Sequence, residues 1–443
     1  MRGIIRTGVG FAWLLCAAAA CAAPAADGKA ATAAGDSTSQ AIEPGLAARR
    51  ARYARPTRER IAMLPAHLLR LPFRIVNYPI EHYLIHREPG AVTVYAGRAL
   101  RRLRTQSLYV GFGELGSESG YGPGLRYDVM PWSRGPRLSI FGATTHRGYD
   151  EVYARLDSIP LGRARLELRG QYDERPQEDF FGLGPDSHLE DHATFQQDET
   201  LVRARARLPL RSRWSLVADV DWSRSDIGRG RDPKFPSVEQ VFPPLAGLAG
   251  RYEFVDVGAG ITYDSRDPRG YARRGQFMQA FISASEGTGG APQAYTKVRF
   301  EAAQFVPLPG WRRSLVGRVR VAFTDNRASE PLPAFRLERI GGGRTLRGYY
   351  TYRFQEEESL LGNVEYRFPI WTIDPPGGLA LDGCAFFDFG TAVPELSDLQ
   401  QRDLRSSAGL GIRFTTATDV VVRIDHGRTA EGHRTHFSLR GTF

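Results

Sequence analysis

The segment Trp214–Trp222 has the sequence WSLVADVDW, in which two sets of side chains alternate. Residues 214, 216, 218, 220 and 222 are all apolar, whereas the intervening set includes Asp219 and Asp221. Because successive side chains of a β-strand point to opposite faces, this period places the carboxylates on one face and a wholly apolar surface on the other. Lipid on one side and a polar lumen on the other would accommodate both faces. The stretch therefore predicts a membrane-spanning β-strand.

The same period of two recurs along residues 105–443, for example in Ala164–Tyr172, Val319–Phe323 and Asn363–Phe368. A soluble β-sandwich also alternates, but its strands average about five or six residues, and many of these segments are longer. The predicted fold class is all-β, a closed antiparallel transmembrane β-barrel of about sixteen strands. The expected strands are 105–114, 123–132, 137–146, 149–159, 162–173, 198–208, 213–223, 252–264, 275–286, 294–307, 313–325, 355–369, 379–391, 405–415, 418–426 and 435–443.

The connections between these strands also alternate in length. Those near residues 134, 161, 210, 309 and 417 are tight, whereas those near 185, 238, 340 and 398 are long. Bacterial outer-membrane barrels have short periplasmic turns and long external loops. The pattern predicts that the two sets lie at opposite ends of the barrel.

The N-terminus has the features of a secretory signal peptide. Arg2 and Arg6 precede the apolar stretch Val9–Ala20, and small residues allow cleavage after Ala22 or Ala25. We therefore expect residues 1–25 to direct export to the cell outer membrane. A weak lipoprotein-like sequence around Cys21 is a less favoured alternative.

Two further segments precede the predicted barrel. Residues 26–55 are rich in Ala, Gly, Ser and Thr and are expected to form a disordered leader. Residues 56–104 carry apolar residues interrupted by Pro65, Pro72 and Pro79, which predicts a short helical or irregular segment that lies in the periplasm or plugs the barrel.

Composition excludes several classes of protein. The chain carries a formal charge of +10, and its basic residues are nearly all Arg, with Lys only at 29, 234 and 297. These arginines are interspersed singly among apolar residues, so we expect no nucleic-acid partner. After the signal, no run approaches the roughly 20 apolar residues of a membrane-spanning helix. Cys384 is the one cysteine beyond the signal region and, from its parity with Asp388, is predicted to face the lumen.

A glycine-rich stretch, Arg339–Tyr349 with the sequence RIGGGRTLRGY, lies in the long connection before the twelfth predicted strand. Leu346, Arg347, Gly348 and Tyr349 resemble the Arg-Gly-aromatic motif in the sixth loop of the bacterial surface antigen family, which includes the BamA and TamA barrels. In that family the loop folds back into the lumen and its Arg meets acidic groups. The resemblance implies Glu365 and Asp388 as partners of Arg347. A flexible external loop with a solvated Arg is the alternative.

Other stretches resemble the same family at the expected strands. They are Gly362–Pro369, Phe386–Gly390, Arg423–Gly427 and the turn Asp264–Gly275. The terminal Phe443 is similar to the C-terminal signal by which outer-membrane barrels are recognised for assembly. In the third long loop, Asp179–Pro185 resembles short family members, and its two Phe residues are expected to cap the barrel mouth.

Motifs for enzymatic chemistry are weak. The stretch Gly111–Gly116 matches a dinucleotide-binding pattern but lacks the following helix that such a site requires. The spaced histidines, His188 with His192 and His433 with His436, suit solvated loop residues better than metal ligands. No nucleophile-elbow sequence accompanies the Ser, His and Asp residues of the loops. We therefore expect no catalytic residue, metal or cofactor, and no enzymatic activity.

The resemblance implies a function in the insertion or translocation of proteins or lipids at the outer membrane. The implied partners are outer-membrane lipids, lipopolysaccharide, unfolded outer-membrane proteins and the barrel-assembly machinery. BamA-like proteins also carry periplasmic polypeptide-transport-associated domains, and the Pro-interrupted residues 56–104 lack the strands of such a domain. The alternatives are a passive pore or structural envelope protein and, after that, an enzymatic barrel.

Overall fold

The strands of the protein form a single antiparallel sheet in which each strand pairs with its neighbours in sequence. The computed structural model describes residues 108–115, 119–129, 135–267, 271–289, 292–309, 312–372, 380–415 and 420–438. The predicted signal peptide, leader and helical segment, and the C-terminal Phe443, lie outside the described residues.

Sixteen strands make up this sheet. They are β1 (Leu108–Glu114), β2 (Tyr121–Val129), β3 (Arg137–Thr144), β4 (Asp150–Leu161), β5 (Ala164–Phe180), β6 (Ala193–Pro209), β7 (Trp214–Arg229), β8 (Gly250–Asp264), β9 (Gly275–Thr288), β10 (Ala294–Pro307), β11 (Ser314–Asn326), β14 (Glu358–Thr372), β15 (Ala380–Val393), β16 (Arg405–Thr415), β17 (Val420–Thr429) and β18 (Gly432–Ser438).

The remaining elements lie in the connections. A second, two-stranded sheet pairs β12 (Glu338–Ile340) with β13 (Phe354–Glu356). The short helices are η2 (Leu189–Asp191), α6 (Val238–Val241), η3 (Ala334–Arg336), η4 (Leu396–Asp398) and η5 (Gln401–Asp403). Within the described ranges, no helix has the length and apolar content to cross a membrane.

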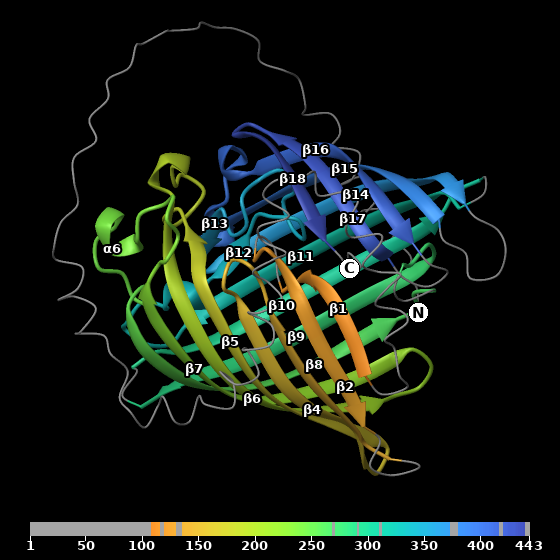
Figure 1. The fold of residues 1–443 in the computed structure, drawn as a ribbon, viewed down its shortest axis with the longest axis horizontal. Coiled ribbons are helices and arrows are strands. Elements are labelled where there is room, and N and C mark those ends of the chain that lie inside the picture. The colour runs from red at the N-terminus through yellow and green to blue at the C-terminus, as the bar shows by residue number, and fades with distance from the viewer. Residues whose placement is uncertain are drawn as a thin grey trace, which may run out of the picture. The chain divides into compact units, whose positions relative to one another are not determined.

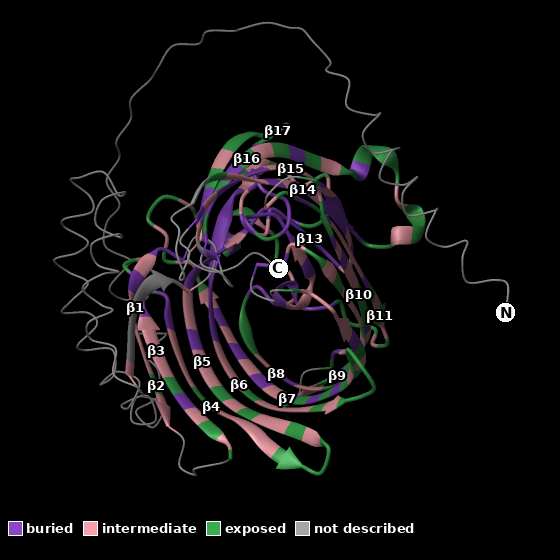
Figure 2. Cartoon of the chain, turned by 90° about the vertical axis from the view of Figure 1, so that its right-hand side faces the viewer, coloured by how far each residue is buried: buried purple, intermediate pink, exposed green. Residues whose placement is uncertain are grey.

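The large sheet curls around a lumen (Figure 1). In the view of Figure 2 the strands surround β13, which lies inside the curve of the sheet. At the two edges, the ring of Tyr121 on β2 lies 5.3 Å from that of Phe437 on β18, in a T-shaped contact. The sheet edges therefore approach each other, as they must in a barrel, although β1–β18 ladder pairing is not present among the described strands.

Burial follows the predicted alternation. On β7, Trp214, Leu216 and Val220 are 40%, 42% and 53% exposed, whereas Asp219 and Asp221 are each 8% exposed. Apolar side chains thus face outward around the sheet and charged ones face the lumen, which is the arrangement of a transmembrane barrel. The predicted all-β, 16-stranded antiparallel fold is confirmed.

The strand ends differ from the prediction where the chain leaves the membrane. β5 continues to Phe180 and β6 begins at Ala193, so the third long loop comprises only residues 181–192. The extension 174–178 is polar on both faces, and without an apolar face the period of two gave no signal there. The twelfth predicted strand was also too long at its start, because Phe354–Glu356 pairs with β12 and the spanning strand β14 begins at Glu358.

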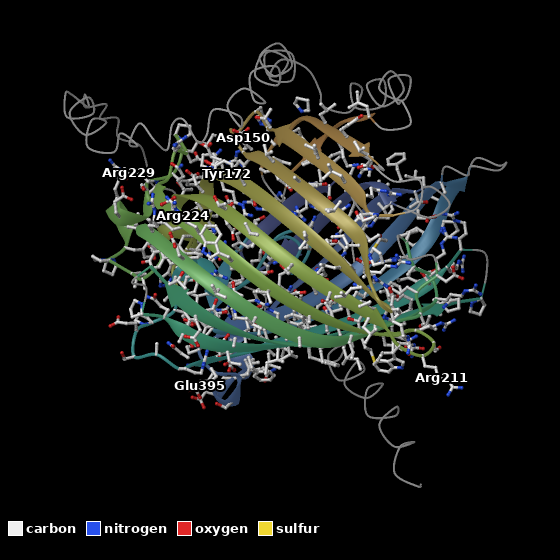
Figure 3. The ribbon with its side chains drawn as sticks, turned by 90° about the horizontal axis from the view of Figure 1, so that it is seen from below. Asp150, Tyr172, Arg211, Arg224, Arg229 and Glu395 are labelled. Atoms are coloured by element: carbon white, nitrogen blue, oxygen red, sulfur yellow. The ribbon has the colours of Figure 1, made fainter. Side chains whose placement is uncertain are left out.

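The connections predicted to be long, near residues 185, 238, 340 and 398, lie at one end of the strands, and those predicted to be tight lie at the other. Figure 3 shows Arg229 and Glu395, beside long connections, near one end of the strands together with Asp150, and Arg211, in the short β6–β7 turn, at the other. We call these the loop end and the turn end. At the loop end, aromatic and aliphatic side chains from β5, β6, β8 and the β11–β14 connection form a buried cluster that includes Phe180, Phe195, Phe254 and Phe335.

Candidate functional site

The connection between β11 and β14, residues 327–357 and hereafter loop six, enters the lumen as a small hairpin. Its stem is the β12–β13 pair, and residues 341–353 form the loop that connects these two strands. Gly341 and Gly342 have φ angles of +119° and +88°, and a Cβ on Gly341 would lie 2.3 Å from the backbone oxygen of Tyr350. Only glycine avoids both the strain and the clash at this position. The side chain of Thr345 accepts from the Gly341 amide and donates to the Gly341 carbonyl.

Arg347 lies at the tip of this hairpin and is 1% exposed. Its Nε and Nη2 donate to the two oxygens of Asp388 on β15 at 2.7 and 2.6 Å, and its backbone amide donates to the same carboxylate at 3.1 Å. Its Nη1 donates to Glu365 on β14. The guanidinium carbon also lies 3.7 Å from the ring centre of Phe386. Arg347 therefore links loop six to two neighbouring strands through a planar, bidentate contact, which an ammonium group cannot make.

These contacts belong to a larger group of buried charges that we call the lumenal charge network. Glu365 also accepts from Arg367, and Asp425 on β17 accepts from Arg413 and Arg423. All of its side chains are at most 5% exposed. A buried charge is tolerated only when oppositely charged and hydrogen-bonded groups surround it. The network comprises Arg347, Arg367, Arg413 and Arg423 with Glu365, Asp388 and Asp425.

The other motif residues fasten the hairpin to the last strands. Gly348 has a φ of +96°, and a Cβ there would lie 2.8 Å from the carbonyl carbon of Gly427 on β17. Its amide donates to Nε2 of His436 on β18 at 3.2 Å. Tyr349 donates from its hydroxyl to the carbonyl of Ser406 on β16. Leu346 is fully buried in a cluster with Tyr349. Of the predicted site residues, the structure thus brings Leu346, Arg347, Gly348, Tyr349, Glu365 and Asp388 together.

Sequence reasoning missed a second arginine of the same hairpin. Arg353 is 2% exposed and donates to the side-chain and backbone oxygens of Ser187, both at 2.7 Å. It also pairs with Glu431 in the β17–β18 turn at 2.8 Å. Arg353 therefore ties loop six to the third long loop and to the last hairpin. Its partners lie in connections without periodicity, so the sequence contained no spacing that would identify them.

The aromatic pair of the third long loop is buried rather than available to a ligand. Phe180 belongs to the loop-end cluster, and Phe181 stacks against His192 with ring centres 4.3 Å apart. His192 in turn contacts a carboxylate oxygen of Asp179 at 2.9 Å. Nothing in these contacts indicates chemistry. Across the described ranges, no group of three or more His, Cys, Asp or Glu side chains could hold a metal ion.

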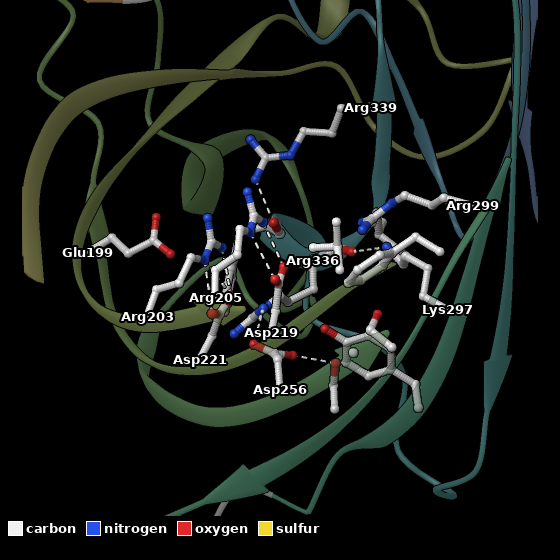
Figure 4. Close-up of a pocket in the computed structure, with 18 of the residues that line it drawn as sticks. Glu199, Arg203, Arg205, Asp219, Asp221, Asp256, Lys297, Arg299, Arg336 and Arg339 are labelled. Carbon is white, nitrogen blue, oxygen red and sulfur yellow. Dashed lines mark hydrogen bonds and ion pairs between the residues drawn. The ribbon is translucent and has the colours of Figure 1, made fainter. Parts of the chain in front are cut away.

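The remaining lumen contains a cavity of about 510 Å³ between β6–β10 and the stem of loop six. Arg203 pairs with Asp221 and Arg205 with Asp219 along one wall, as Figure 4 shows. From loop six, Arg336 crosses to Ser223 and Asp256. The cavity is therefore lined by paired charges, and loop six covers one side of it.

At the stem of loop six, Glu338 contacts Lys297 at 3.0 Å and Arg299 at 3.1 Å. Burial acts to raise the pKa of Glu338, but the two cations outweigh it and lower the pKa to about 2. Glu338 is therefore ionised at neutral pH and attaches the stem to β10. Together the stem and tip contacts make loop six a fixed part of the lumen.

Comparison with known proteins identifies the family. Residues 159–427, more than half of the chain, match the Omp85 superfamily domain. The structure of BamA from Haemophilus ducreyi lacking POTRA domains 1–3 aligns with a TM-score of 0.56 and 14% identity, over 76% of this chain and 70% of that one. CdiB from Escherichia coli aligns with a TM-score of 0.49 and 11% identity, over 76% and 62% of the two chains. No curated protein sequence matches this chain.

The extent of the domain match decides the assignment. It spans the strands from β4 to β17, including loop six and the lumenal charge network. The fold independently resembles that of BamA. The chain belongs to the Omp85 superfamily of outer-membrane β-barrels.

Proposed function

We propose that the protein assists the insertion or translocation of polypeptides, or of lipids, at the Gram-negative outer membrane. The observation that carries the proposal is the attachment of loop six: Arg347 and Gly348 hold the hairpin against β14, β15, β17 and β18. The seam of the barrel is the line where the edge strands β1 and β18 meet. The strands on the β18 side of this seam are thereby fixed from within the lumen. No catalytic step is part of this function.

The seam itself supplies the proposed mechanism. β1 and β18 form no ladder with each other among the described residues, although Tyr121 and Phe437 are in contact across this side of the sheet. A strand edge that is not paired presents backbone N–H and C=O groups to which another strand can add. A client β-strand would add to one of these edges, and loop six would keep the C-terminal strands in place while it does so.

The proposed setting follows from the family. The predicted signal peptide at residues 1–25 would direct export, and residues 56–104 would lie on the periplasmic side, where the turn end also lies. The proposed partners are unfolded outer-membrane proteins, the barrel-assembly machinery, phospholipid and lipopolysaccharide.

A covalent cross-link across the seam tests the proposal. Cysteines introduced at Tyr121 and Phe437 in a Cys384→Ser background would be joined by a short thiol cross-linker, because their rings are in contact across the sheet edges. The expected result is that the cross-linked protein in liposomes no longer accelerates folding of an unfolded barrel client. As the control, cysteines at Ile424 and Phe437 join strands that are already paired. Equal activity of both cross-linked proteins would exclude the seam mechanism.

A passive pore is the second candidate, favoured by the 510 Å³ polar cavity. Loop six covers one side of that cavity, so a pore would require the loop to move. Single-channel recordings distinguish the two functions. Steady conductance in wild type, together with no effect on client folding, would favour the pore.

A further inference from the structure

Five exposed arginines gather at the turn end in the two adjacent hairpins β4–β5 and β6–β7. Figure 3 shows Arg211 at this end, opposite Asp150 and Arg229. We call the group the arginine rim. Its members are Arg163, Arg165, Arg207, Arg211 and Arg213.

The rim lacks the acidic partners found elsewhere in the protein. Segments 158–166 and 206–216, which contain all five residues, have no Asp or Glu. For the side chains that the structure describes, no ion pair involves a member of the rim. Two exposed arginines at the loop end differ, since Arg229 pairs with Glu239, and Arg251 with Asp226. Within the part of the chain that the structure describes, no acidic side chain therefore balances the charge of the rim.

Two rim residues are placed where their repulsion is strongest. Arg165 on β5 and Arg207 on β6 are direct cross-strand partners. Like charges directly opposite each other destabilise a sheet. Both alternate with outward-facing leucines and point toward the lumen, where Arg207 lines the cavity. They add positive charge to this end of the barrel, and contact with a ligand outside the barrel is left to Arg163, Arg211 and Arg213.

Apolar side chains beside the rim indicate what kind of ligand this is. Leu161, the last residue of β4, is 60% exposed, and Leu210, in the β6–β7 turn, is 37% exposed. Trp214, 40% exposed, packs against Tyr263 with ring centres 5.0 Å apart. Tryptophan and tyrosine mark the level at which the lipid-facing band of a barrel meets the headgroups. A dissolved anion or an acidic protein would give these apolar groups no reason to be exposed beside arginine.

We propose that the arginine rim binds the phosphate groups of anionic phospholipids in the leaflet at the turn end. Leu161, Leu210 and Trp214 would lie among the upper acyl chains, while Arg163, Arg211 and Arg213 reach the phosphates, which suit the guanidinium fork. The assignment to the periplasmic leaflet rests on the orientation given under Proposed function. Binding itself does not depend on insertase activity.

Lipid selectivity tests the proposal with the full chain refolded in vesicles. Brominated phosphatidylglycerol and brominated phosphatidylcholine, each in a phosphatidylcholine background, would quench tryptophan fluorescence according to their concentration beside the barrel. The variant R163Q/R211Q/R213Q removes three rim charges from exposed positions. The matched control R229Q/R402Q/R428Q removes three charges from exposed arginines of the loop end. Heat-modifiable migration on gels would show that all proteins are folded.

Wild type and control are expected to prefer phosphatidylglycerol, and the rim variant should lose at least about threefold of that preference, since each basic residue near an anionic surface contributes about fivefold. Added salt should weaken the preference in wild type. An unchanged preference in the rim variant, or an equal loss in the control, would overturn the proposal. If inorganic phosphate at constant ionic strength abolished the preference, the rim would be a site for free anions. If the rim variant lost only the capture of an acidic protein, a protein partner would replace lipid.

Discussion

Arg347 joins carboxylates from two different strands, and both carboxylates are fully buried. Its removal would leave Glu365 and Asp388 without their shared cation in a site that water does not reach. We expect Arg347→Ala to destabilise the barrel by about 3–5 kcal/mol, and Arg347→Lys to recover only part of this. The temperature at which the fast-migrating folded band converts on gels measures the effect.

Arg344 provides the matched control for that substitution, since it lies three residues away and its side chain is exposed. Arg344→Ala should leave the transition temperature unchanged, and the loop should stay resistant to external protease. Identical transitions for Arg347→Ala and wild type would show that the hairpin is not held by this contact.

Arg353 makes a separate link, from loop six to Ser187 and Glu431. Arg353→Ala should cost about 1–3 kcal/mol, because part-buried hydrogen bonds from a charged donor are lost. Hydrogen exchange at residues 181–192 should increase, whereas the exposed Arg402→Ala should have no effect. An equal increase of hydrogen exchange in both variants would indicate a general loss of stability and not the loss of this contact.

Of the two arginines that fasten loop six, the lumenal contact of Arg347 was predicted from the sequence and the contacts of Arg353 were not. Arg347 was found because its neighbours form a family motif and because parity placed Glu365 and Asp388 on lumenal faces. Arg353 binds Ser187 and Glu431, which lie in loops more than 70 residues away in either direction. Contacts between loops produce no periodic pattern in the sequence, so such partners can be identified only from the three-dimensional structure.

Individual strands were predictable because the membrane imposes one apolar face on each of them. Thus β10 and β16 begin and end as the alternation indicated, at Ala294–Pro307 and Arg405–Thr415. Where β5 and β6 rise beyond the apolar band, their ladder continues to Phe180 and Ala193 without that constraint. Backbone hydrogen bonds and the buried loop-end cluster, which includes Phe180 and Phe195, stabilise the extension, and neither produces a period of two in the sequence.

Val220 tests the lipid-facing side of β7, since 53% of it is exposed on the outward face. Val220→Arg should reduce stability in vesicles by about 2–4 kcal/mol if the residue lies near the bilayer midplane. Leu161→Arg, at the turn end, should cost about 0–1 kcal/mol. Denaturant titration of folding in vesicles gives both values. Equal costs would mean that β7 has been assigned the wrong depth.

Cys384 tests the opposite face, on β15. It is 1% exposed, as its predicted lumenal orientation requires. A lipid-soluble maleimide should therefore label it slowly in the folded protein, whereas Val220→Cys in a Cys384→Ser background should react quickly. Mass spectrometry of timed samples would report both rates. Rapid labelling of native Cys384 would contradict the inward orientation.

For the whole molecule, the barrel has three regions that differ in how their charged side chains are paired. The lumen beside β14–β17 contains paired buried charges that fix loop six, and the lumen beside β6–β10 keeps a cavity lined by ion pairs. The arginine rim, in contrast, carries cations without acids in the same segments. Composition alone predicted the positive net charge but could not separate these regions, because the separation depends on which hairpins are neighbours.

The position of Arg347 along the chain also has a consequence for the order of folding. Its partners all follow it: Glu365 by 18 residues and Asp388 by 41, with Asp425 later still. The hairpin cannot dock until β14 and β15 have paired and β17 has taken its place beside β16. Because contacts distant in sequence form late, docking of loop six would come near the end of barrel folding. A chain that stalled before β15 would leave Arg347 undocked, and proteases could distinguish unfinished barrels from finished ones at this loop.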